Sequence, residues 1–457
     1  MMMEYMIRFT HVHETFRLPE IQALAVLEGI DLEVSSYNSD VREYSPLDYP
    51  PAYTWKSPFC IVKLPSEDAA IRLLRRSVLA KAIYEHWGSG ANYEELHQNV
   101  RETSQHLWHL YKDSSFKFTV DSFQGTRTMA EQRQLIEDFS FLAFEGPIRM
   151  KGADQHFCIS EDWQRDVFPF TIKDPRKIHL GRFLSEGQRD IIGKYDLKKR
   201  KYICTTSMDA ELALITANIT LAAPGKLFYD PFVGSGSFPV ACAHFGALAF
   251  GSDIDGRSIR GKGKSNLFTN FVQYGLTNQY GDSFIADLTH TPLREARLFD
   301  GIICDPPYGV REGLKVLGSR DPTKPKVPVY RDGKAHHTED AYMPPKRPYS
   351  FLAMLDDILE FASISLVDGG RLSFWMPTAN DEDQEITIPQ HQCLELTSVC
   401  TQTFNKWSRK LITYKRIPNS EVINTPREER VKESGVSADD LNPFRKGYFK
   451  GFKTAFR

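Results

Sequence analysis

The chain has 457 residues, of which 41% are hydrophobic and 25% charged, an ordinary composition for a soluble globular protein of two or three domains. No apolar run is long enough to span a bilayer, and the Met-rich start lacks a signal-peptide core, so we expect no membrane partner and a cytoplasmic location, with the nucleus as the alternative. The seven scattered cysteines form no C-x-x-C pair, which argues against a disulfide framework or a zinc knuckle. The net charge of −2 does not by itself indicate a nucleic-acid binder, but its distribution along the chain is uneven.

The beginning of the sequence predicts a small α+β module over residues 1–58. Residues 4–12 alternate between apolar and polar types, as a strand does. Residues 19–29 have a helical pattern with Pro in the first turn and Gly after the end.

A second α+β domain is expected over residues 59–175. Residues 59–64 predict a strand, and a helix begins at Ser66 and keeps apolar spacing as far as Ala82. The further predicted elements are a strand over 116–123, a helix over 128–141, and edge strands over 154–163 and 177–182. Strands and helices mix here without a regular β-α repeat, so this domain differs from the one that follows.

Residues 176–205 are highly charged and contain three glycines, and we expect them to form a linker. A block of four consecutive basic residues lies near its end and is suited to contact nucleic-acid phosphates. The candidate phosphate contacts, which the family resemblance described below would assign to RNA, are Arg182, Lys198, Lys199, Arg200 and Lys201. The structural alternative is a solvated charged surface without a partner.

From residue 206 the pattern becomes β-α-β, which predicts an α/β domain over residues 206–417. Strands are expected over residues 227–230, 247–253, 285–287 and 299–305. Helices are expected over residues 208–222, 239–245 and 259–274. The short apolar runs that end in an acid are typical of buried parallel strands, whose carboxyl ends form a ligand-binding edge.

The segment over residues 310–349 is the longest irregular stretch, and a loop of this length in a compact domain is usually functional or disordered. A helix over 350–366, a buried strand over 370–376 and a closing pair of strands between residues 394 and 416 complete the predicted domain. Residues 418–457 lose periodicity and are interpreted as a basic tail.

The first strand of the α/β domain ends at Asp230 and leads into a glycine turn that predicts a cofactor site. Gly234 and Gly236 allow the backbone to approach a ligand, and a helix N-terminus follows. Phe232 lies within the turn and belongs to the candidate site. Pro239 stands where a dinucleotide site would have its third glycine. A turn that binds nothing is the structural alternative.

Acids at the next two strand ends favour a nucleoside-containing cofactor. Asp253 ends the second strand, and we expect Asp253 and its neighbour Ile254 to contact a ribose. A carboxylate at this position can accept hydrogen bonds from both ribose hydroxyls. Asp287 can accept an adenine amino group, although a helix N-cap is nearly as good an explanation. Thr206 and Ser207 precede the first helix and can lie against the remaining part of the cofactor, or can serve as a cap only.

The catalytic candidates are the four residues of the motif Asp305-Pro306-Pro307-Tyr308, which suits methylation of an exocyclic amine on a planar ring. The Asp305 carboxylate and a backbone carbonyl, expected to be that of Pro306, can accept the amine hydrogens and orient its lone pair. The two prolines fix the turn, and Tyr308 offers an aromatic face for stacking a flipped base. A simple Pro-Pro turn capped by Asp305 is the structural alternative.

Two other features look chemical but have simpler explanations. His336 and His337 form a pair in a loop without a third ligand, so we expect no metal there. Cys304, next to Asp305, is interpreted as a small strand residue and not as a nucleophile.

The motifs together resemble a known family. Residues 228–255 and the string Asp-Pro-Pro-Tyr-Gly-Val-Arg-Glu over 305–312 resemble class I amino-methyltransferases that depend on S-adenosylmethionine. With Gly-Gln-Arg-Asp-Ile-Ile over 187–192 and Thr-Ser-Met-Asp over 206–209, they are similar to the catalytic subunits of tRNA (guanine-10-N2)-methyltransferases. This resemblance covers roughly residues 175–415. The N-terminal part resembles the same family more loosely.

The resemblance implies a Rossmann-like, seven-stranded class I methyltransferase domain preceded by a ferredoxin-like module and a THUMP domain. It implies S-adenosylmethionine as the cofactor, tRNA as a partner, and a small zinc-binding activator subunit as a second partner. Asp230, Gly234 and Gly236 would then hold the methionine end of the cofactor, and residues 305–308 would hold guanine N2.

Two competing functions stay open on the sequence. DNA adenine-N6 or cytosine-N4 methyltransferases share the Asp-Pro-Pro-Tyr chemistry, but the long N-terminal α+β region disfavours them. A non-catalytic RNA-binding scaffold is disfavoured because Asp230, Asp253 and Asp305 are all present.

Overall fold

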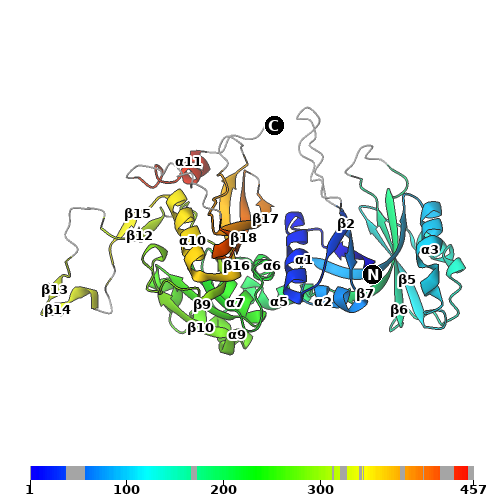
Figure 1. Cartoon of the computed structure of the whole chain (residues 1–457), viewed down its shortest axis with the longest axis horizontal. Coiled ribbons are helices and arrows are strands. Elements are labelled where there is room, and N and C mark those ends of the chain that lie inside the picture. The colour runs from blue at the N-terminus through cyan, green and yellow to red at the C-terminus, as the bar shows by residue number, and fades with distance from the viewer. Residues whose placement is uncertain are drawn as a thin grey trace. The chain divides into compact units, whose positions relative to one another are not determined.

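The computed structural model divides the chain into two compact units, Met1–Ile191 and Ile192–Arg457 (Figure 1). The residues that the structure describes are 2–37, 57–165, 172–310, 313–319, 327–338, 342, 344–380, 386–404, 406–422 and 437–450. In these parts of the chain, no helix combines the length and the apolar character needed to cross a membrane.

The first unit is built on one seven-stranded sheet with the strand order β2-β3-β1-β4-β7-β6-β5. Its strands are β1 (Met3–Phe9), β2 (Glu33–Tyr37), β3 (Phe59–Leu64), β4 (Ala80–Gly90), β5 (Phe116–Phe123), β6 (Gln155–Asp162) and β7 (Lys177–Glu186). Its helices are α1 (Glu14–Glu28), α2 (Glu67–Leu74), α3 (Tyr93–Trp108) and α4 (Met129–Glu137). All pairs are antiparallel except β5 with β6. Strands from both sides of the predicted boundary at residues 58–59 belong to this one sheet. Strand β7 also belongs to it, although its residues lie within the predicted linker. The division into a 1–58 module and a 59–175 domain stays a prediction.

Two expectations for this unit are wrong. The strands predicted as edges, β6 and β7, lie inside the sheet, and β7 pairs with both β4 and β6. The helix that begins after Ser66 ends at Leu74, and Ala82 belongs to β4. The Ser66 hydroxyl accepts the Ala69 amide, as expected of an N-cap. Over a few positions, the apolar residues of a short helix and of the strand after it can have the spacing of one longer helix, so the sequence pattern does not show where the helix ends.

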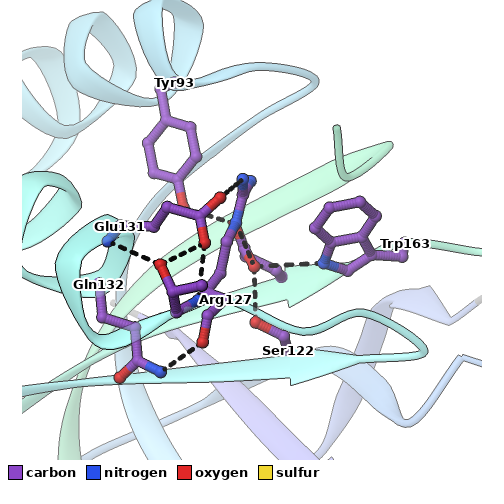
Figure 2. A network of polar contacts seen from close by, with 8 residues as sticks. Tyr93, Ser122, Arg127, Glu131, Gln132 and Trp163 are labelled. Atoms are coloured by element: carbon purple, nitrogen blue, oxygen red, sulfur yellow. Dashed lines mark hydrogen bonds and ion pairs between the residues drawn. The ribbon is translucent and has the colours of Figure 1, made fainter. Parts of the chain in front are cut away.

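A buried acid links β6 to the elements around it. Glu161 is fully buried, and its carboxylate accepts hydrogen bonds from Arg127 (2.8 Å), Tyr93 (2.8 Å), Ser122 (2.6 Å) and Trp163 (3.2 Å). These four side chains converge from separate segments (Figure 2). Burial alone would raise the pKa of Glu161, but the hydrogen bonds and the Arg127 charge outweigh it, so the pKa lies below its usual value.

The second unit contains a seven-stranded sheet with the order β10-β9-β8-β11-β16-β18-β17. Its strands are β8 (Leu227–Asp230), β9 (Leu248–Asp253), β10 (Tyr280–Ile285), β11 (Phe299–Cys304), β16 (Leu366–Ala379), β17 (Leu394–Thr403) and β18 (Trp407–Arg416). Its helices are α5 (Ile192–Tyr195), α6 (Ala210–Ile219), α7 (Ser237–His244), α8 (Gly256–Arg260), α9 (Leu267–Tyr274), α10 (Phe351–Ser365) and α11 (Pro443–Lys450). The five neighbouring strands β10, β9, β8, β11 and β16 are parallel, and β18 is antiparallel to both its neighbours. The predicted Rossmann-like, seven-stranded fold is therefore confirmed.

The helix predicted over residues 259–274 is broken into α8 and α9. Gly261 has a φ of +66°, and a Cβ there would lie 2.0 Å from the Ser265 carbonyl oxygen. Asn266 then caps α9 by accepting the Thr269 amide. The break lets the chain turn between two short helices beside β9 and β10.

The described parts of the 310–349 segment contain two short pairs of strands. Strands β12 (Lys315–Leu317) and β15 (Lys346–Pro348) pair with each other, as do β13 (Tyr330–Arg331) and β14 (Lys334–Ala335). His336 and His337 lie in a short 3-10 turn.

The tail predicted over residues 418–457 contains helix α11. The prediction that this tail lacks periodic structure is therefore wrong for residues 443–450. The buried side chain of Phe444 packs against Ala379 of β16.

Candidate active site

Three acids meet at the carboxyl edge of the second sheet. Asp230 ends β8, Asp253 ends β9, and Asp305 follows β11. Burial raises the pKa of Asp230 well above its usual value, and the charges of Asp253 and Asp305 raise it further, because the three carboxylates are close enough to repel one another. Three carboxylates gathered at one edge of a sheet are suited to a ligand that carries positive charge or donates hydrogen bonds.

The glycine turn after β8 forms as the sequence predicts. The Asp230 carboxylate accepts the Phe232 amide (2.9 Å), and the Asp253 carboxylate accepts the Gly234 amide (3.0 Å). Gly234 and Gly236 have φ values of +48° and +83°. Since residues with a side chain rarely adopt these values, the turn depends on glycine at both positions. The structure therefore brings the first two predicted strand-end acids and the glycines together.

The end of β9 is held by backbone and by the 310–349 segment. Asp253 accepts the Asp255 amide (2.8 Å) in addition to that of Gly234, and burial raises the pKa of Asp253. The Ile254 carbonyl accepts a hydrogen bond from the Lys346 ammonium group of β15 (3.2 Å). Part of the long segment thus packs at the end of the cofactor candidate site.

Ser207 and Thr206 differ in their surroundings. The Ser207 hydroxyl lies 2.6 Å from that of Ser235 in the glycine turn and accepts the Cys204 amide at 2.9 Å. Thr206 is exposed. Ser207 therefore joins the segment before α6 to the glycine turn, which is the neighbourhood that the sequence predicts.

Asp287 lies two residues beyond β10 and is buried. Its carboxylate accepts the Thr289 amide (3.0 Å) and the Leu317 amide of β12 (2.6 Å). The N-cap alternative is therefore confirmed, for a short 3-10 helix. A contact with adenine stays a prediction.

The turn after β11 presents an unused acceptor. Oδ1 of Asp305 is buried and accepts no hydrogen bond from any residue that the structure describes. Burial raises the pKa of Asp305 to about 6, although the neighbouring Tyr308 and the positive charge of Arg409 lower it. Pro306 is buried, whereas Pro307 is exposed. An unsatisfied buried acceptor is costly, and such groups deserve an explanation in function.

Aromatic residues that we did not predict surround this turn. The Tyr308 ring centroid lies 6.4 Å from that of Trp407 on β18, which stacks on Phe404 at 4.5 Å. Arg409, also on β18, lies with its guanidinium group 4.6 Å from the Trp375 ring centroid. The alternating pattern of β18 gives no sign that its side chains reach another strand's loop.

The predicted RNA contacts separate into two groups. Lys198, Lys199 and Lys201, which we call the exposed lysine triad, are exposed to solvent. Arg200 is only 6% exposed and donates to the Ser237 hydroxyl (3.0 Å) at the start of α7, so we correct its assignment to a structural residue.

Arg182, which lies in the first unit, also needs correction. It is buried on β7, where it forms ion pairs with Glu85 (2.8 Å) and Glu67 (2.5 Å). With its charge neutralised by two acids, Arg182 is a structural residue and not a phosphate contact. Its position in an interior strand explains why a sequence pattern of basic residues misplaced it.

Within the described residues, no group of three or more His, Cys, Asp or Glu side chains is arranged to hold a metal ion. Cys304 is fully buried in β11, as a strand residue would be.

The geometry fits a cationic nucleoside cofactor. Asp253 offers carboxylate oxygens at a strand end, the glycine turn leaves backbone accessible without a Cβ, and the acid cluster favours positive charge. Beside it, the free oxygen of Asp305 is available to accept a hydrogen from a substrate. The site can therefore hold a charged donor and orient an amine next to it.

The sequence matches two protein families. The family described as Tmrp11 THUMP N-terminal domain matches residues 3–45 and 50–189, and the family described as RMKL-like, methyltransferase domain matches residues 198–317. The predicted THUMP region and the predicted methyltransferase domain are thereby confirmed.

Relatives are similar over almost the full length of the chain. The tRNA (guanine(10)-N(2))-methyltransferase of Saccharomyces cerevisiae is 40% identical, over 99% of this chain and 100% of the relative. The enzyme of the same name from Schizosaccharomyces pombe is 38% identical over 91% and 90%, and the human TRMT11 is 35% identical over 98% and 95%. The chain belongs to the tRNA (guanine(10)-N(2))-methyltransferase family.

Proposed function

We propose that this protein transfers a methyl group to the exocyclic N2 of a guanosine in tRNA, at position 10, as the catalytic subunit of a two-protein complex. The printed names of its relatives support the substrate, and the family supports S-adenosylmethionine as the cofactor. The observation that carries the chemical part is the buried Oδ1 of Asp305, which has no hydrogen-bond partner among the described residues and lies near the carboxylate of Asp230.

S-adenosylmethionine supplies an electrophilic methyl group when it is bound. Asp230, Phe232, Gly234 and Gly236 would bind it through the turn after β8, Asp253 and Ile254 at the end of β9, Asp287 beyond β10, and Ser207 with Thr206 from the segment before α6. The carboxylates balance its positive charge. This assignment uses the strand ends and the turn whose geometry is described above.

Asp305 would accept one hydrogen of the guanine amine, and the Pro306 carbonyl would accept the other. These contacts orient the nitrogen lone pair toward the methyl carbon, so the main gain is orientation and electrostatic stabilisation. Pro307 stiffens the turn, and Tyr308 provides a face for the base. When the C–N bond forms, the amine must lose a proton, and a carboxylate with a pKa of about 6 is suited to accept it.

The exposed lysine triad would contact tRNA phosphates. A small zinc-binding activator, which the family resemblance suggests, would bind elsewhere on the methyltransferase domain. Strand β10, which ends the sheet in the part of the chain that the structure describes, is a candidate for this contact. Ile285 of β10 is 53% exposed, and Phe268 and Val272 of the neighbouring α9 are 43% and 51% exposed.

The test uses labelled S-adenosylmethionine and, in parallel reactions, DNA or tRNA that lacks its modifications, with and without a candidate activator. Nucleoside analysis is expected to find N2-methylguanosine or N2,N2-dimethylguanosine, and mapping of the labelled RNA fragments is expected to place it at position 10. Label in DNA adenine would support the DNA methyltransferase alternative instead. Absence of label from every nucleic acid, together with retained tRNA binding, would favour a scaffold and refute the proposal.

A further inference from the structure

A segment near the end of the chain packs along the catalytic turn. Residues 437–450 contain α11, drawn in red in Figure 1, and this helix contacts β16. The Leu441 carbonyl accepts the Phe351 amide at the start of α10 (3.0 Å), and the buried Phe444 belongs to a cluster with Val310 and Trp407. These contacts fix the start of α11 beside the residues that follow Tyr308.

Asn442 connects the helix to the turn with both ends of its amide. Its side chain is only 2% exposed. The Nδ2 group donates to the Tyr308 carbonyl (2.8 Å), and Oδ1 accepts the Arg445 amide (3.0 Å). Asn442 therefore caps α11 while it holds the backbone of the catalytic motif.

The contact is close enough to exclude a larger residue opposite it. Gly309 has a φ of +71°, and a Cβ at Gly309 would lie 2.6 Å from Nδ2 of Asn442. The backbone after the two prolines therefore passes through Gly309, a residue with wide conformational freedom, at the point where Asn442 makes its contact.

Arg445 holds the next two carbonyls. Its guanidinium group donates to the carbonyls of Gly309 and Val310, the latter at 2.6 Å. Asp439 pairs with the same guanidinium group (2.7 Å), which orients it toward the turn. Three consecutive carbonyls, of residues 308–310, are thereby bound by two side chains from the C-terminal segment.

We infer that Asn442 and Arg445 are positioning residues for methyl transfer, which hold the backbone after Tyr308 so that Asp305 and the Pro306 carbonyl stay aligned with the substrate amine. The inference rests on the proposed function. The prolines restrict the motif itself, whereas the backbone that follows Tyr308 contains Gly309 and depends on these hydrogen bonds. Loss of a contact would let the turn move, and small displacements of reacting groups are expensive in rate.

The test compares variants of the full-length protein, with its candidate activator, in steady-state methyl transfer to unmodified tRNA. Asn442→Ser keeps an oxygen that can cap α11 but lacks the amide that reaches Tyr308. Arg445→Gln loses the bonds to two carbonyls. We expect both to lower kcat by about 10- to 100-fold, while the KM for tRNA and the Kd for S-adenosylmethionine change by less than about twofold.

Lys446→Gln is the matched control, because Lys446 is exposed on the same helix and its replacement removes the same charge as Arg445→Gln. It is expected to keep the wild-type kcat. A wild-type kcat in Asn442→Ser or Arg445→Gln would overturn the inference. So would a rise in the KM for tRNA that is equal in Arg445→Gln and Lys446→Gln at unchanged kcat, since that would make α11 an RNA-contact surface.

Thermal unfolding separates positioning from folding. We expect Asn442→Ser to unfold within a few degrees of the wild type, and a kcat loss that merely follows a loss of folded protein would contradict the inference. If the wild-type protein transfers no methyl group to tRNA, the proposed function fails, and that result is distinct from active wild-type protein with unaffected variants.

Discussion

Replacing Asp305 with Asn is expected to inactivate the enzyme and to stabilise its fold. Burial raises the pKa of Asp305 from 3.8 to about 6, so ionising this carboxyl opposes folding at neutral pH. The folded state binds the proton more tightly than the unfolded state does. The stability contributed by the protonated carboxyl is therefore present at low pH and is lost as the pH rises through about 6.

The size of the effect follows from the shift. A difference of about 2 pKa units corresponds to roughly 3 kcal/mol when the carboxyl is fully ionised, at about pH 7.5. Near pH 4.5 most folded molecules keep the proton, and the difference falls to about 1 kcal/mol. Asn has nearly the same shape but carries no charge, so Asp305→Asn should relieve this cost without filling or emptying space.

The assay measures unfolding of the cofactor-free variant and wild-type protein at both pH values, alongside methyl transfer. We expect transfer to fall by at least about 100-fold, because the Asn amide carries no negative charge and cannot accept the proton that the amine loses. In the wild type, kcat/KM should decline as the pH falls through about 6, since the free enzyme needs the ionised carboxylate. An Asp305→Asn protein that is less stable than wild type at about pH 7.5, or equally stabilised at both pH values, would refute this reasoning.

Three further predictions test other parts of the structure. Glu161→Gln should lower the free energy of unfolding by about 3–5 kcal/mol, because it leaves the Arg127 charge without its buried partner; unchanged thermal unfolding at neutral pH would contradict this. Gly236→Ala should weaken S-adenosylmethionine binding and cost about 1–2 kcal/mol of stability, because its φ is +83° and its Cβ would crowd α9. Gly225→Ala is its control, with a φ of +79° and open space around the new Cβ within the described structure; equal loss of cofactor affinity in both would argue against a cofactor role for the turn. Replacing the exposed lysine triad by Gln should weaken tRNA binding and reduce its salt slope by up to about one per lysine; an unchanged slope would make the triad a solvated surface.

The fold of the second unit could largely be predicted from local sequence. Short apolar runs that end in Asp are typical of parallel strands, and the predicted first strand coincides with β8 (Leu227–Asp230). The carboxyl ends of parallel strands share an edge, so Asp230, Asp253 and Asp305 could be brought together without knowledge of side-chain positions. The resemblance to a known family supplied the expected number of strands in the sheet.

Side-chain burial was harder to predict than strand position. Arg182 and Arg200 are basic residues in or near charged stretches, and sequence alone gives both the appearance of phosphate contacts. Their partners, Glu67 and Glu85 for Arg182 and Ser237 for Arg200, lie between 37 and 115 positions away along the chain. Only tertiary structure brings such partners together, so a local charge pattern cannot distinguish a buried ion pair from an exposed contact.

The same limitation concealed the role that we infer for the C-terminal segment, and the catalytic role that we propose for Asp305 explains why such a segment would be needed. An ionised carboxylate in a dry site gains free energy by turning toward water, so the group that makes the site reactive also favours opening of the turn. Pro306 and Pro307 oppose this motion on one side of the motif. On the other side, Gly309 does not restrict the backbone, and the hydrogen bonds from Asn442 and Arg445 hold it in place instead. A reactive carboxylate therefore requires that the backbone be restrained on both sides of its turn. The two prolines of the motif provide one restraint, and residues of the C-terminal segment, far away in the sequence, provide the other.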